Sequence, residues 1–477
     1  MAMALFIELG LGFTRQVANL ALVLELRCQL ICALRMVSNW RVRGDQLMVF
    51  ACTFLAYALM HATRKTLSSV KPLMIANLVG HMDDTNSPFT RTTSDDAAIF
   101  MGTLDFLFLL SYALGLYVTG WLGDLFDPRN VLASGMFGGA VTTFLFGVPP
   151  QWGHFYNQYW YAILWFANGF LQAPGWPAGV SLVAYSFPAA RGLVLGFWST
   201  SAGVGNIIGA LLPSAVIDYG HKIVFLTTSC LLAGTVFLVL AGVPTGIVKI
   251  PKPKHPTKTI NRVPLYRVIC LPELICHASA YAGLKLVNYS FFWLPFYLHN
   301  KFNWDPGPAS ALSAFYDLGG LFGGIVGGGI SDLSCVSRNW VNIVFLVLCV
   351  PCLLVYRSTP GSPWALHGFV MGLTGFMIAG PANLLSAVVG TDLAALPQLQ
   401  GRRVLSTMTG FIDGAGSLGA AMGQIWVPVL QSKLGWDWAF HLFLDFNTFL
   451  IVCIPSGVSP SACHLLALNN HQVECQL

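Results

Sequence analysis

The sequence predicts an all-α membrane protein with twelve transmembrane helices in two pseudo-symmetric six-helix halves. Three observations support this fold class. Only 9% of the 477 residues are charged and 55% are hydrophobic, whereas soluble domains carry roughly 25% charged residues. Apolar runs recur along the chain, and several short motifs occur twice in the same order. So much apolar surface requires lipid as a second solvent. A secreted disulfide scaffold, a disordered chain and an ordinary cytosolic enzyme are therefore excluded.

The apolar runs are long enough to cross a hydrocarbon layer of about 30 Å as helices. We place six spans in each half of the chain. In the first half they cover residues 47–71, 98–122, 130–149, 157–184, 192–217 and 222–248. In the second half they cover residues 271–299, 309–331, 340–356, 364–389, 404–430 and 437–455.

Charge placement predicts the topology. The segment between the two sets of spans, residues 249–267, carries six Lys or Arg residues and no acid. Under the positive-inside rule this linker is cytoplasmic. With six spans on either side, both termini are expected in the cytoplasm. The loop that contains Asp83, Asp84, Asp95 and Asp96 is then expected to face the lumen or the exterior.

The apolar runs and the charged stretches between them divide the sequence into five segments. The apolar stretch near the N-terminus is interrupted by Glu25 and Arg27, so we interpret it as a cytoplasmic or interfacial extension rather than a span. The expected segments are this extension (1–45), the N-terminal six-helix half (46–248), the basic cytoplasmic linker (249–267), the C-terminal six-helix half (268–456) and a C-terminal tail (457–477).

Motifs repeat between the halves at offsets of about 205 to 214 residues. A Gly-rich turn with Asp124 and Arg129 recurs with Asp332 and Arg338, and acids precede both copies. Two related halves around a central pathway are typical of secondary transporters. We therefore expect the repeated charges to make contacts that hold one state of the transport cycle without touching substrate. These gating or salt-bridge candidates are Asp124, Arg129, Asp332, Arg338, Asp105 and Asp317.

The motif G-x-x-x-D-x-x-x-x-R from Gly120 to Arg129, which recurs with one additional residue before Arg338, resembles the signature of the major facilitator superfamily. Within it, the run from Tyr57 to Thr66 resembles the organophosphate:phosphate antiporter group, and the run from Tyr281 to Tyr297 resembles the sugar-phosphate exchanger family. The resemblance covers residues 46–455. It implies exchange of phosphorylated sugars across an endomembrane, that of the endoplasmic reticulum or lysosome. Members of this group often carry a His in the fifth span, where this chain has none between Trp198 and Gly205.

Two cations lie inside predicted spans, Arg64 in the first half and Lys285 in the second. A charge at this depth is costly, so it normally faces a partner or a water-filled cavity. Helical spacing places polar neighbours on the same face as each cation. We expect the two faces to meet and form an anion site, and the resemblance assigns Arg64 and Lys285 to substrate binding. The candidate substrate-binding residues are Arg64, Lys285, Tyr57, His61, Tyr281 and Asn288.

A structural role for these charges is the alternative. Arg64 or Lys65 would then pair with Asp105, and Lys285 would pair with Asp317 or Asp413, as ion pairs inside the bundle. His61 would be a hydrogen-bonded bundle residue, and Tyr57 and Tyr281 would be packing aromatics.

The expected function is secondary active transport of a phosphorylated sugar or a related organophosphate or phosphonate anion, with inorganic phosphate as the candidate counter-substrate. The sequence has no phosphate-binding loop motif for ATP and no zinc or Ser/His/Asp signature, so we expect no cofactor, no metal and no enzyme activity. Expected partners are a small anionic substrate and the lipid bilayer, but no nucleic acid. The alternative is a non-transporting membrane subunit or sensor that acts through an accessory membrane partner.

Overall fold

The computed structural model describes residues 43–80, 94–153, 155, 157–188, 191–216, 219–247, 268–293, 297–298, 301–302, 306–332, 338–360, 363–396, 399 and 403–453. No strand occurs within these ranges. The predicted N-terminal extension (apart from its last three residues), the basic linker, Asp83, Asp84 and the C-terminal tail lie outside the described residues.

Helices occur among the described residues of each of the twelve predicted spans. The first half contains α2 (Gly44–Gly80), α3 (Ser94–Leu125), α4 (Pro128–Gly147), α5 (Pro149–Trp152), α6 (Gln158–Gln172), α7 (Gly175–Ser186), α8 (Arg191–Ser199), α9 (Ser201–Val216) and α10 (His221–Gly242). The second half contains α12 (Pro272–Ser290), α14 (Pro306–Ser331), α15 (Arg338–Ser358), α16 (Trp364–Asn383), α17 (Val389–Ala394), α18 (Leu405–Leu434) and α19 (Trp436–Cys453).

Seven helical stretches among the described residues are long and apolar enough to cross a membrane. They cover α2, α3, α4 with α5, α8 with α9, α10, α15, and α16 with α17. Two of the helices outside this set are α12 and α18, which carry the charged residues Lys285 and Asp413. Polar side chains lower mean hydropathy, so helices that line a polar site are expected to give the weaker spanning signal.

Several predicted spans are divided in the structure, among them the fourth, the fifth and the tenth. The predicted range 157–184 becomes α6 and α7, because Pro174 and Pro177 have no N–H to continue the helical hydrogen bonds. The fifth span breaks between Ser199 and Ser201. In the tenth span a π-helical segment, Leu384–Val388, separates α16 from α17. The sequence prediction treated each range as one run, so the structure corrects it at these places.

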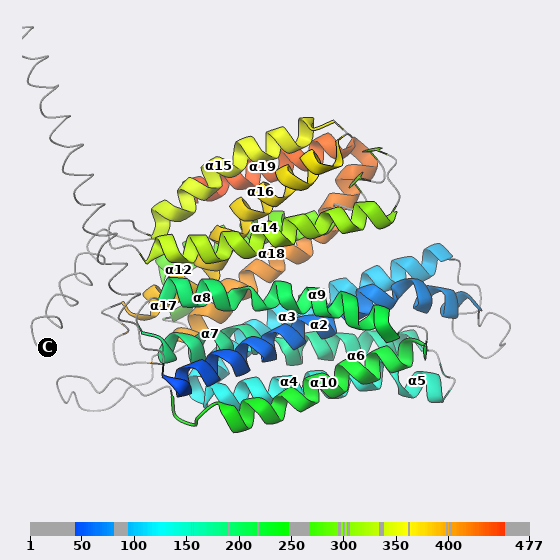
Figure 1. Ribbon diagram of the computed structural model, residues 1–477, viewed down its shortest axis with the longest axis horizontal. Coiled ribbons are helices and arrows are strands. Elements are labelled where there is room, and N and C mark those ends of the chain that lie inside the picture. The colour runs from blue at the N-terminus through cyan, green and yellow to red at the C-terminus, as the bar shows by residue number, and fades with distance from the viewer. Residues whose placement is uncertain are drawn as a thin grey trace, which may run out of the picture.

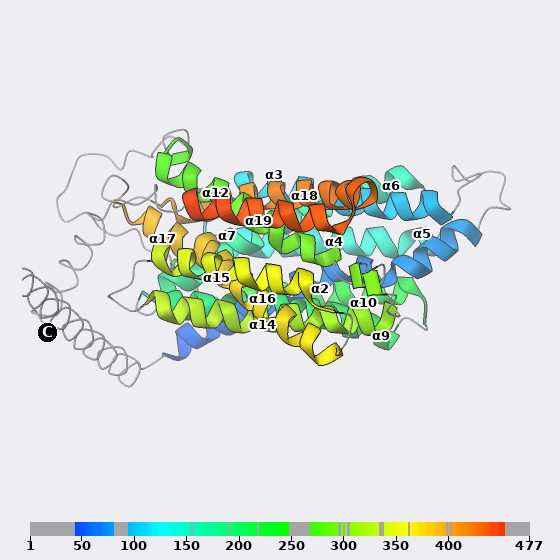
Figure 2. The same ribbon diagram turned by 90° about the horizontal axis from the view of Figure 1, so that it is seen from above.

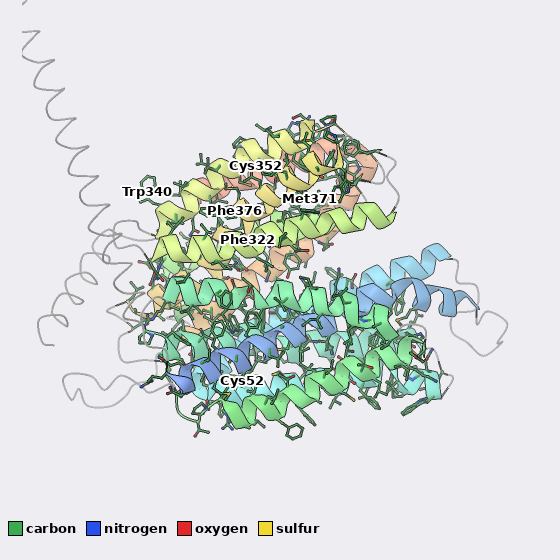
Figure 3. All side chains as sticks on the ribbon, in the orientation of Figure 1. Cys52, Phe322, Trp340, Cys352, Met371 and Phe376 are labelled. Carbon is green, nitrogen blue, oxygen red and sulfur yellow. The ribbon has the colours of Figure 1, made fainter. Side chains whose placement is uncertain are left out.

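The helices form two bundles that lie side by side (Figures 1 and 2). Buried apolar residues form two clusters, one centred on each bundle. Large apolar side chains cover the outer faces, and Phe237 and Phe369 are 74% and 70% exposed. Figure 3 shows Trp340 pointing away from the second bundle at the start of α15. Such a surface fits a lipid environment rather than water.

The bundles meet closely at one end of the molecule. There α18 packs along α3, and α14 packs along α8 (Figure 1). A Cβ atom at Gly120 would lie 2.7 Å from the Ser406 carbonyl oxygen, and one at Gly192 would lie 2.5 Å from that of Gly328. Only glycine permits backbones to approach so closely. Several of the repeated glycines therefore serve the junction between the halves.

Candidate anion site between the two halves

Arg64 of α2 and Lys285 of α12 meet at the ring of Tyr112 on α3. The Cζ atom of Arg64 lies 4.2 Å from the centre of this ring, and the Nζ atom of Lys285 lies 6.0 Å from it. A cation within about 6 Å of an aromatic ring centre is attracted by the ring electrons. The two cations predicted from separate halves are therefore held at one place.

The groups around Arg64 are neutral. Its Nε donates to Oε1 of Gln172 on α6 at 2.9 Å, and its Nη1 lies 3.4 Å from Nε2 of His61. Phe108 lies on the same side as Tyr112, with its ring centre 5.6 Å from Cζ. Among the residues that the structure describes, no carboxylate lies within ion-pair distance of Arg64. Its positive charge is thus not compensated by an acid.

His61 connects Arg64 to the fifth span. Its Nδ1 lies 3.4 Å from Oδ1 of Asn206 on α9. The guanidinium can only donate, so Nε2 of His61 accepts from it and Nδ1 carries the proton that faces Asn206. The geometry therefore assigns a neutral imidazole with its proton on Nδ1.

Lys285 differs from Arg64 because it has a carboxylate partner. Its Nζ lies 2.7 Å from Oδ1 of Asp413 and 3.0 Å from Oγ of Ser417, both on α18. Lys285 and Asp413 are 7% and 3% exposed. The ion pair with Asp413 that we considered as an alternative is present, whereas the pairing of Arg64 with Asp105 is not.

The other candidate side chains surround this site at different distances from the cations. Tyr57 packs against His61 and Trp198, with ring centres 4.8 Å and 5.2 Å away. The ring centre of Tyr281 lies 5.6 Å from Nζ of Lys285. Asn288 accepts a hydrogen bond of 2.7 Å from the hydroxyl of Tyr316 on α14. Tyr281 is thus next to a cation, while Asn288 is occupied by a neighbouring helix.

The repeated acids lie at the close junction between the halves. Asp124, at the end of α3, accepts from the N–H groups of Ser406 and Thr407 at 3.0 and 2.7 Å. Asp332, after α14, accepts from the N–H groups of Gly192 and Leu193, each at 2.9 Å. Each acid therefore caps the first turn of a helix in the opposite half, where N–H groups lack helical partners.

The repeated arginines do not behave alike. Arg338 lies 3.6 Å from Asp332 and also pairs with Asp392 on α17. Arg129 instead donates to the backbone carbonyl of Leu240 on α10, and no ion pair with Asp124 is found among the described residues. The structure thus shows an ion-paired arginine in one copy of the motif and a backbone-bound one in the other. Burial raises the pKa of the Asp332 carboxyl, and the Leu193 N–H and Arg338 oppose this shift.

Asp105 and Asp317, which precede the repeated motifs, do not contact Arg64 or Lys285. Asp317 on α14 is exposed and lies close enough to Lys65 for an electrostatic interaction across the halves. Asp105 on α3 is half-buried. Neither acid is part of the cluster around Tyr112.

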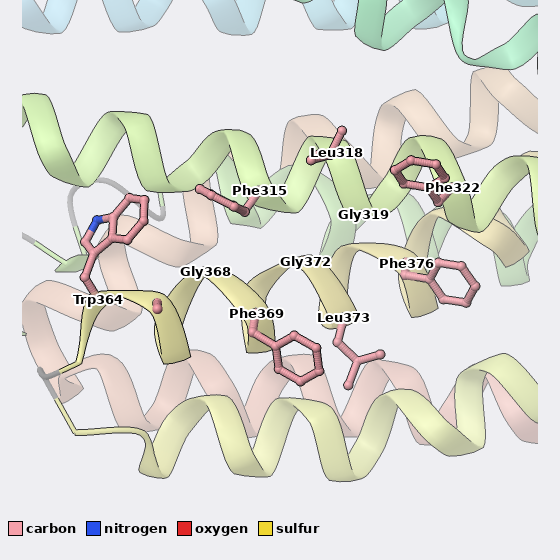
Figure 4. A pocket seen from close by; sticks show the side chains of 11 residues that line it. Phe315, Leu318, Gly319, Phe322, Trp364, Gly368, Phe369, Gly372, Leu373 and Phe376 are labelled. Atoms are coloured by element: carbon pink, nitrogen blue, oxygen red, sulfur yellow. The ribbon is translucent and has the colours of Figure 1, made fainter.

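An apolar cavity of about 440 Å³ lies between α14 and α16 (Figure 4). Aromatic side chains and glycines form its walls, among them Phe315, Phe322 and Trp364. No charged side chain lines it. It therefore does not suit an anion, and it is separate from the site at Tyr112.

Several site residues were missed by the sequence interpretation. Tyr112, Gln172 and Ser417 are polar residues within apolar spans, and nothing about their spacing links them to Arg64 or Lys285. Polar residues inside spans usually face the bundle interior. That rule could have identified Gln172, but only the packing of α6 against α3 and α4 brings it to Arg64 of α2.

Comparisons with known proteins agree with this architecture. A profile described as the Major Facilitator Superfamily matches residues 53–424. Sugar phosphate exchanger 3 of Homo sapiens is 37% identical over 85% of this chain and 91% of its own length. The protein of the same name from Bos taurus is 36% identical over 89% of this chain and 95% of its own. The glucose-6-phosphate exchanger SLC37A2 of Xenopus laevis is 29% identical over 83% of this chain and 89% of its own.

A solved structure shares the fold. The crystal structure of the human organic anion transporter MFSD10 superposes with a TM-score of 0.69 and 15% sequence identity. The match covers 86% of this chain and 100% of that chain. At this identity the likeness shows the helical architecture alone.

Proposed function

The chain belongs to the Major Facilitator Superfamily, and we propose that it is a secondary transporter for a phosphorylated sugar or a related organophosphate or phosphonate anion. Its curated relatives are named as exchangers and transporters, which favours transport over enzyme activity and over a non-transporting subunit. Its apolar helices make it a multi-pass membrane protein.

One observation carries the proposal: the half-buried Arg64 and the buried Lys285, from opposite halves, lie near the same ring, and Arg64 has no acidic partner among the described residues. The planar guanidinium can bind two phosphate oxygens at once, and the ammonium of Lys285 supplies a compact second charge. Because water is scarce at this depth, both attractions are stronger than at a surface. Arg64, Lys285, Tyr57, His61, Tyr281 and Asn288 are the proposed substrate-site residues.

The contacts at the junction support alternating access. Asp124 and Asp332 hold the two halves together at one end through backbone N–H groups. The basic linker favours the cytoplasm for this end, and on that assignment we infer a state closed toward the cytoplasm. We assign both termini to the cytoplasm because of the charge of this linker. We assign the protein to an endomembrane because of the family resemblance.

Exchange for inorganic phosphate fits the site. The fifth span lacks a His between Trp198 and Gly205, but His61 of α2 places an imidazole beside Arg64 and faces Asn206 of that span. The first span thus supplies the imidazole that the fifth span does not. Both phosphate and a sugar phosphate would use the same phosphoryl contacts.

Counterflow tests the proposal. Purified protein is reconstituted in liposomes loaded with excess unlabelled glucose 6-phosphate, glycerol 3-phosphate or inorganic phosphate, and labelled anion is added outside. We expect labelled anion to accumulate transiently, and we expect Arg64→Gln to abolish this signal. Arg357→Gln is the matched control, because Arg357 pairs with Asp437 outside the site. If a well-folded protein accumulates no phosphorylated anion, the proposed transport is wrong, and a partner that co-purifies would favour the non-transporting alternative.

A further inference from the structure

A chain of buried neutral side chains holds Arg64 in place. Gln172 accepts from Nε of Arg64 and donates through Nε2 to Oδ1 of Asn168 at 2.6 Å. Asn168 in turn donates through Nδ2 to the Gly139 carbonyl at 3.0 Å and to Thr142 Oγ1 at 2.8 Å. Asn168 and Gln172 are both 0% exposed. The chain runs from the site on α2, through α6, to the backbone of α4.

The groups at the two ends of this series of hydrogen bonds, the Gly139 carbonyl and the Arg64 guanidinium, determine the direction of each bond between them. The carbonyl oxygen of Gly139 can only accept, and the guanidinium of Arg64 can only donate. Asn168 must therefore place its NH₂ group toward α4 and its oxygen toward Gln172. Gln172 must then use its NH₂ group toward Asn168, so its oxygen faces Arg64.

Thr142 and Thr63 support the same directions. The hydroxyl of Thr142 donates to the Gly138 carbonyl at 2.8 Å, and that of Thr63 donates to the Met60 carbonyl at 2.7 Å. Each hydroxyl oxygen is then available to accept, Thr142 from Asn168 and Thr63 from Gln172, the latter at 3.2 Å. If Gln172 rotated, its NH₂ group would face the guanidinium, which needs an acceptor there.

We propose that Asn168 is a positioning residue for anion binding, which acts through Gln172 to orient the Arg64 guanidinium. This inference rests on the proposed transport function and adds a residue that does not touch the substrate. This series of hydrogen bonds orients Arg64 through the neutral oxygen of Gln172 rather than through a carboxylate. The guanidinium is thereby oriented while its full charge stays available to the anion.

Among the described residues of the second half, the equivalent positions form no such series of hydrogen bonds. At the repeat offset between Gly169 and Gly375, the counterparts of Asn168 and Gln172 are Thr374 and Ile378. Thr374 is 0% exposed and donates only to the Val370 carbonyl of its own helix, at 2.8 Å. The amides are thus not a general feature of this helix packing. They occur in the half that carries the cation without an acid.

Two variants of Asn168 and one control test this role. Asn168→Ala removes the link, and Asn168→Leu keeps a branched side chain but has no NH₂ group to donate to Gly139 and no oxygen to accept from Gln172. Thr374→Ala is the matched control, because it truncates the equivalent buried residue. Each full-length protein is reconstituted, and initial rates of phosphate exchange are measured over a range of phosphate concentrations. Thermal unfolding with and without inorganic phosphate gives a readout independent of transport.

We expect both Asn168 variants to raise KM for phosphate about tenfold, the loss typical of one charge-assisted hydrogen bond, while the maximal rate changes by less than about twofold. Phosphate should also raise their Tm less than it raises that of the wild type, and Thr374→Ala should match the wild type in KM. Unchanged KM in both Asn168 variants would overturn the positioning role while leaving transport intact, as would an equal rise in Thr374→Ala. If the wild type itself shows neither exchange nor a phosphate-dependent Tm shift, the proposed function fails, and the inference fails with it.

Discussion

The ammonium of Lys285 lies 2.7 Å from the carboxylate of Asp413, and both side chains are almost completely buried. Arg64, whose guanidinium lies against the ring of Tyr112, is held by the neutral side chains of Gln172 and His61. The two halves therefore contribute different cations to one site. Arg64 offers an uncompensated charge, whereas Lys285 must share its charge between Asp413 and any bound anion.

Removing Lys285 is expected to cost far more stability than removing Arg64. Lys285→Met leaves the Asp413 carboxylate buried without a partner, which typically costs roughly 3–5 kcal/mol. Arg64→Gln leaves no acid behind. Thermal unfolding of the purified variants measures both effects. The double variant Lys285→Met with Asp413→Leu should recover most of the loss, and a double variant as unstable as Lys285→Met alone would show that the ion pair is not the cause.

Asp413→Asn should increase the response of the protein to phosphate. The substitution leaves Lys285 without its counter-charge, so the folded protein loses stability, but a bound anion can restore the missing partner. We expect a lower Tm without ligand and a larger rise in Tm on adding inorganic phosphate than in the wild type. A smaller rise than in the wild type would mean that Asp413 supports anion binding instead of competing with it.

Arg64→Lys should impair transport although it keeps the charge. A lysine has no Nε–H fork to donate to Gln172 while binding two phosphate oxygens. We expect the KM for phosphate in counterflow to rise about tenfold or more, in line with the loss of one charge-assisted hydrogen bond. Arg357→Lys, in the ion pair with Asp437 away from the site, is the control and should leave KM unchanged. Equal KM values for Arg64→Lys and the wild type would exclude a bidentate contact.

Tyr112 should act through its ring. The ring lies beside both cations, and a desolvated cation–π contact contributes about 2 kcal/mol. Tyr112→Phe keeps the ring and should retain most of the phosphate affinity, whereas Tyr112→Leu should lower it by about tenfold or more. Phosphate binding to the purified variants, followed by Tm shifts, distinguishes the two. If Phe and Leu reduce binding equally, the hydroxyl rather than the ring is the important group.

Asp124→Ala should favour the state that is open toward the cytoplasm. It removes the cap on the first turn of α18 across the halves, a loss of about 1 kcal/mol, which corresponds to about fivefold in population. Ser181, whose Oγ lies 2.7 Å from Ser406 Oγ, reports this opening when it is replaced by cysteine. Its alkylation by an impermeant maleimide from the cytoplasmic side should become about fivefold faster.

Asp127→Ala provides the control for that experiment. Asp127 lies in the same turn but caps α4 and bonds Gly246 within its own half. Its removal should destabilise the turn without changing the alkylation rate at position 181. Equal acceleration in both variants would show that loosening of the turn, not loss of the contact between halves, exposes Ser181.

The sequence predicted the elements of the fold because the length of an apolar run can be read from consecutive residues alone. Helices occur among the described residues of each predicted range, and the repeated Asp124 and Asp332 occupy equivalent places at the junction. It could not predict the divisions at Thr200 and at the π-helical segment Leu384–Val388. Residue type gives little signal there, since the backbone conformation depends on packing against other helices.

The candidate site was predicted in part. Intramembrane charge identified Arg64 and Lys285, because an ion in lipid is costly wherever its partner lies. The partner of each cation, in contrast, depends on how the helices pack against one another. Asp413 is 128 residues from Lys285, and Gln172 is 108 residues from Arg64. A single sequence contains no signal that joins such distant positions. The sequence therefore left Asp317 and Asp413 as alternative partners of Lys285, and it did not predict the hydrogen bonds from Arg64 through Gln172 to Asn168.

Equilibrium binding of labelled glucose 6-phosphate to purified wild type and to Arg64→Gln, in one detergent preparation, tests the central claim most directly. Arg64 is expected to supply the uncompensated charge for the phosphoryl group, while its removal leaves no unpaired acid and so should preserve the fold. We expect saturable binding to the wild type that unlabelled inorganic phosphate displaces, and at least a hundredfold weaker binding to Arg64→Gln, the effect of losing a charged, bidentate contact. Equal affinity of the two proteins would contradict the proposed anion site.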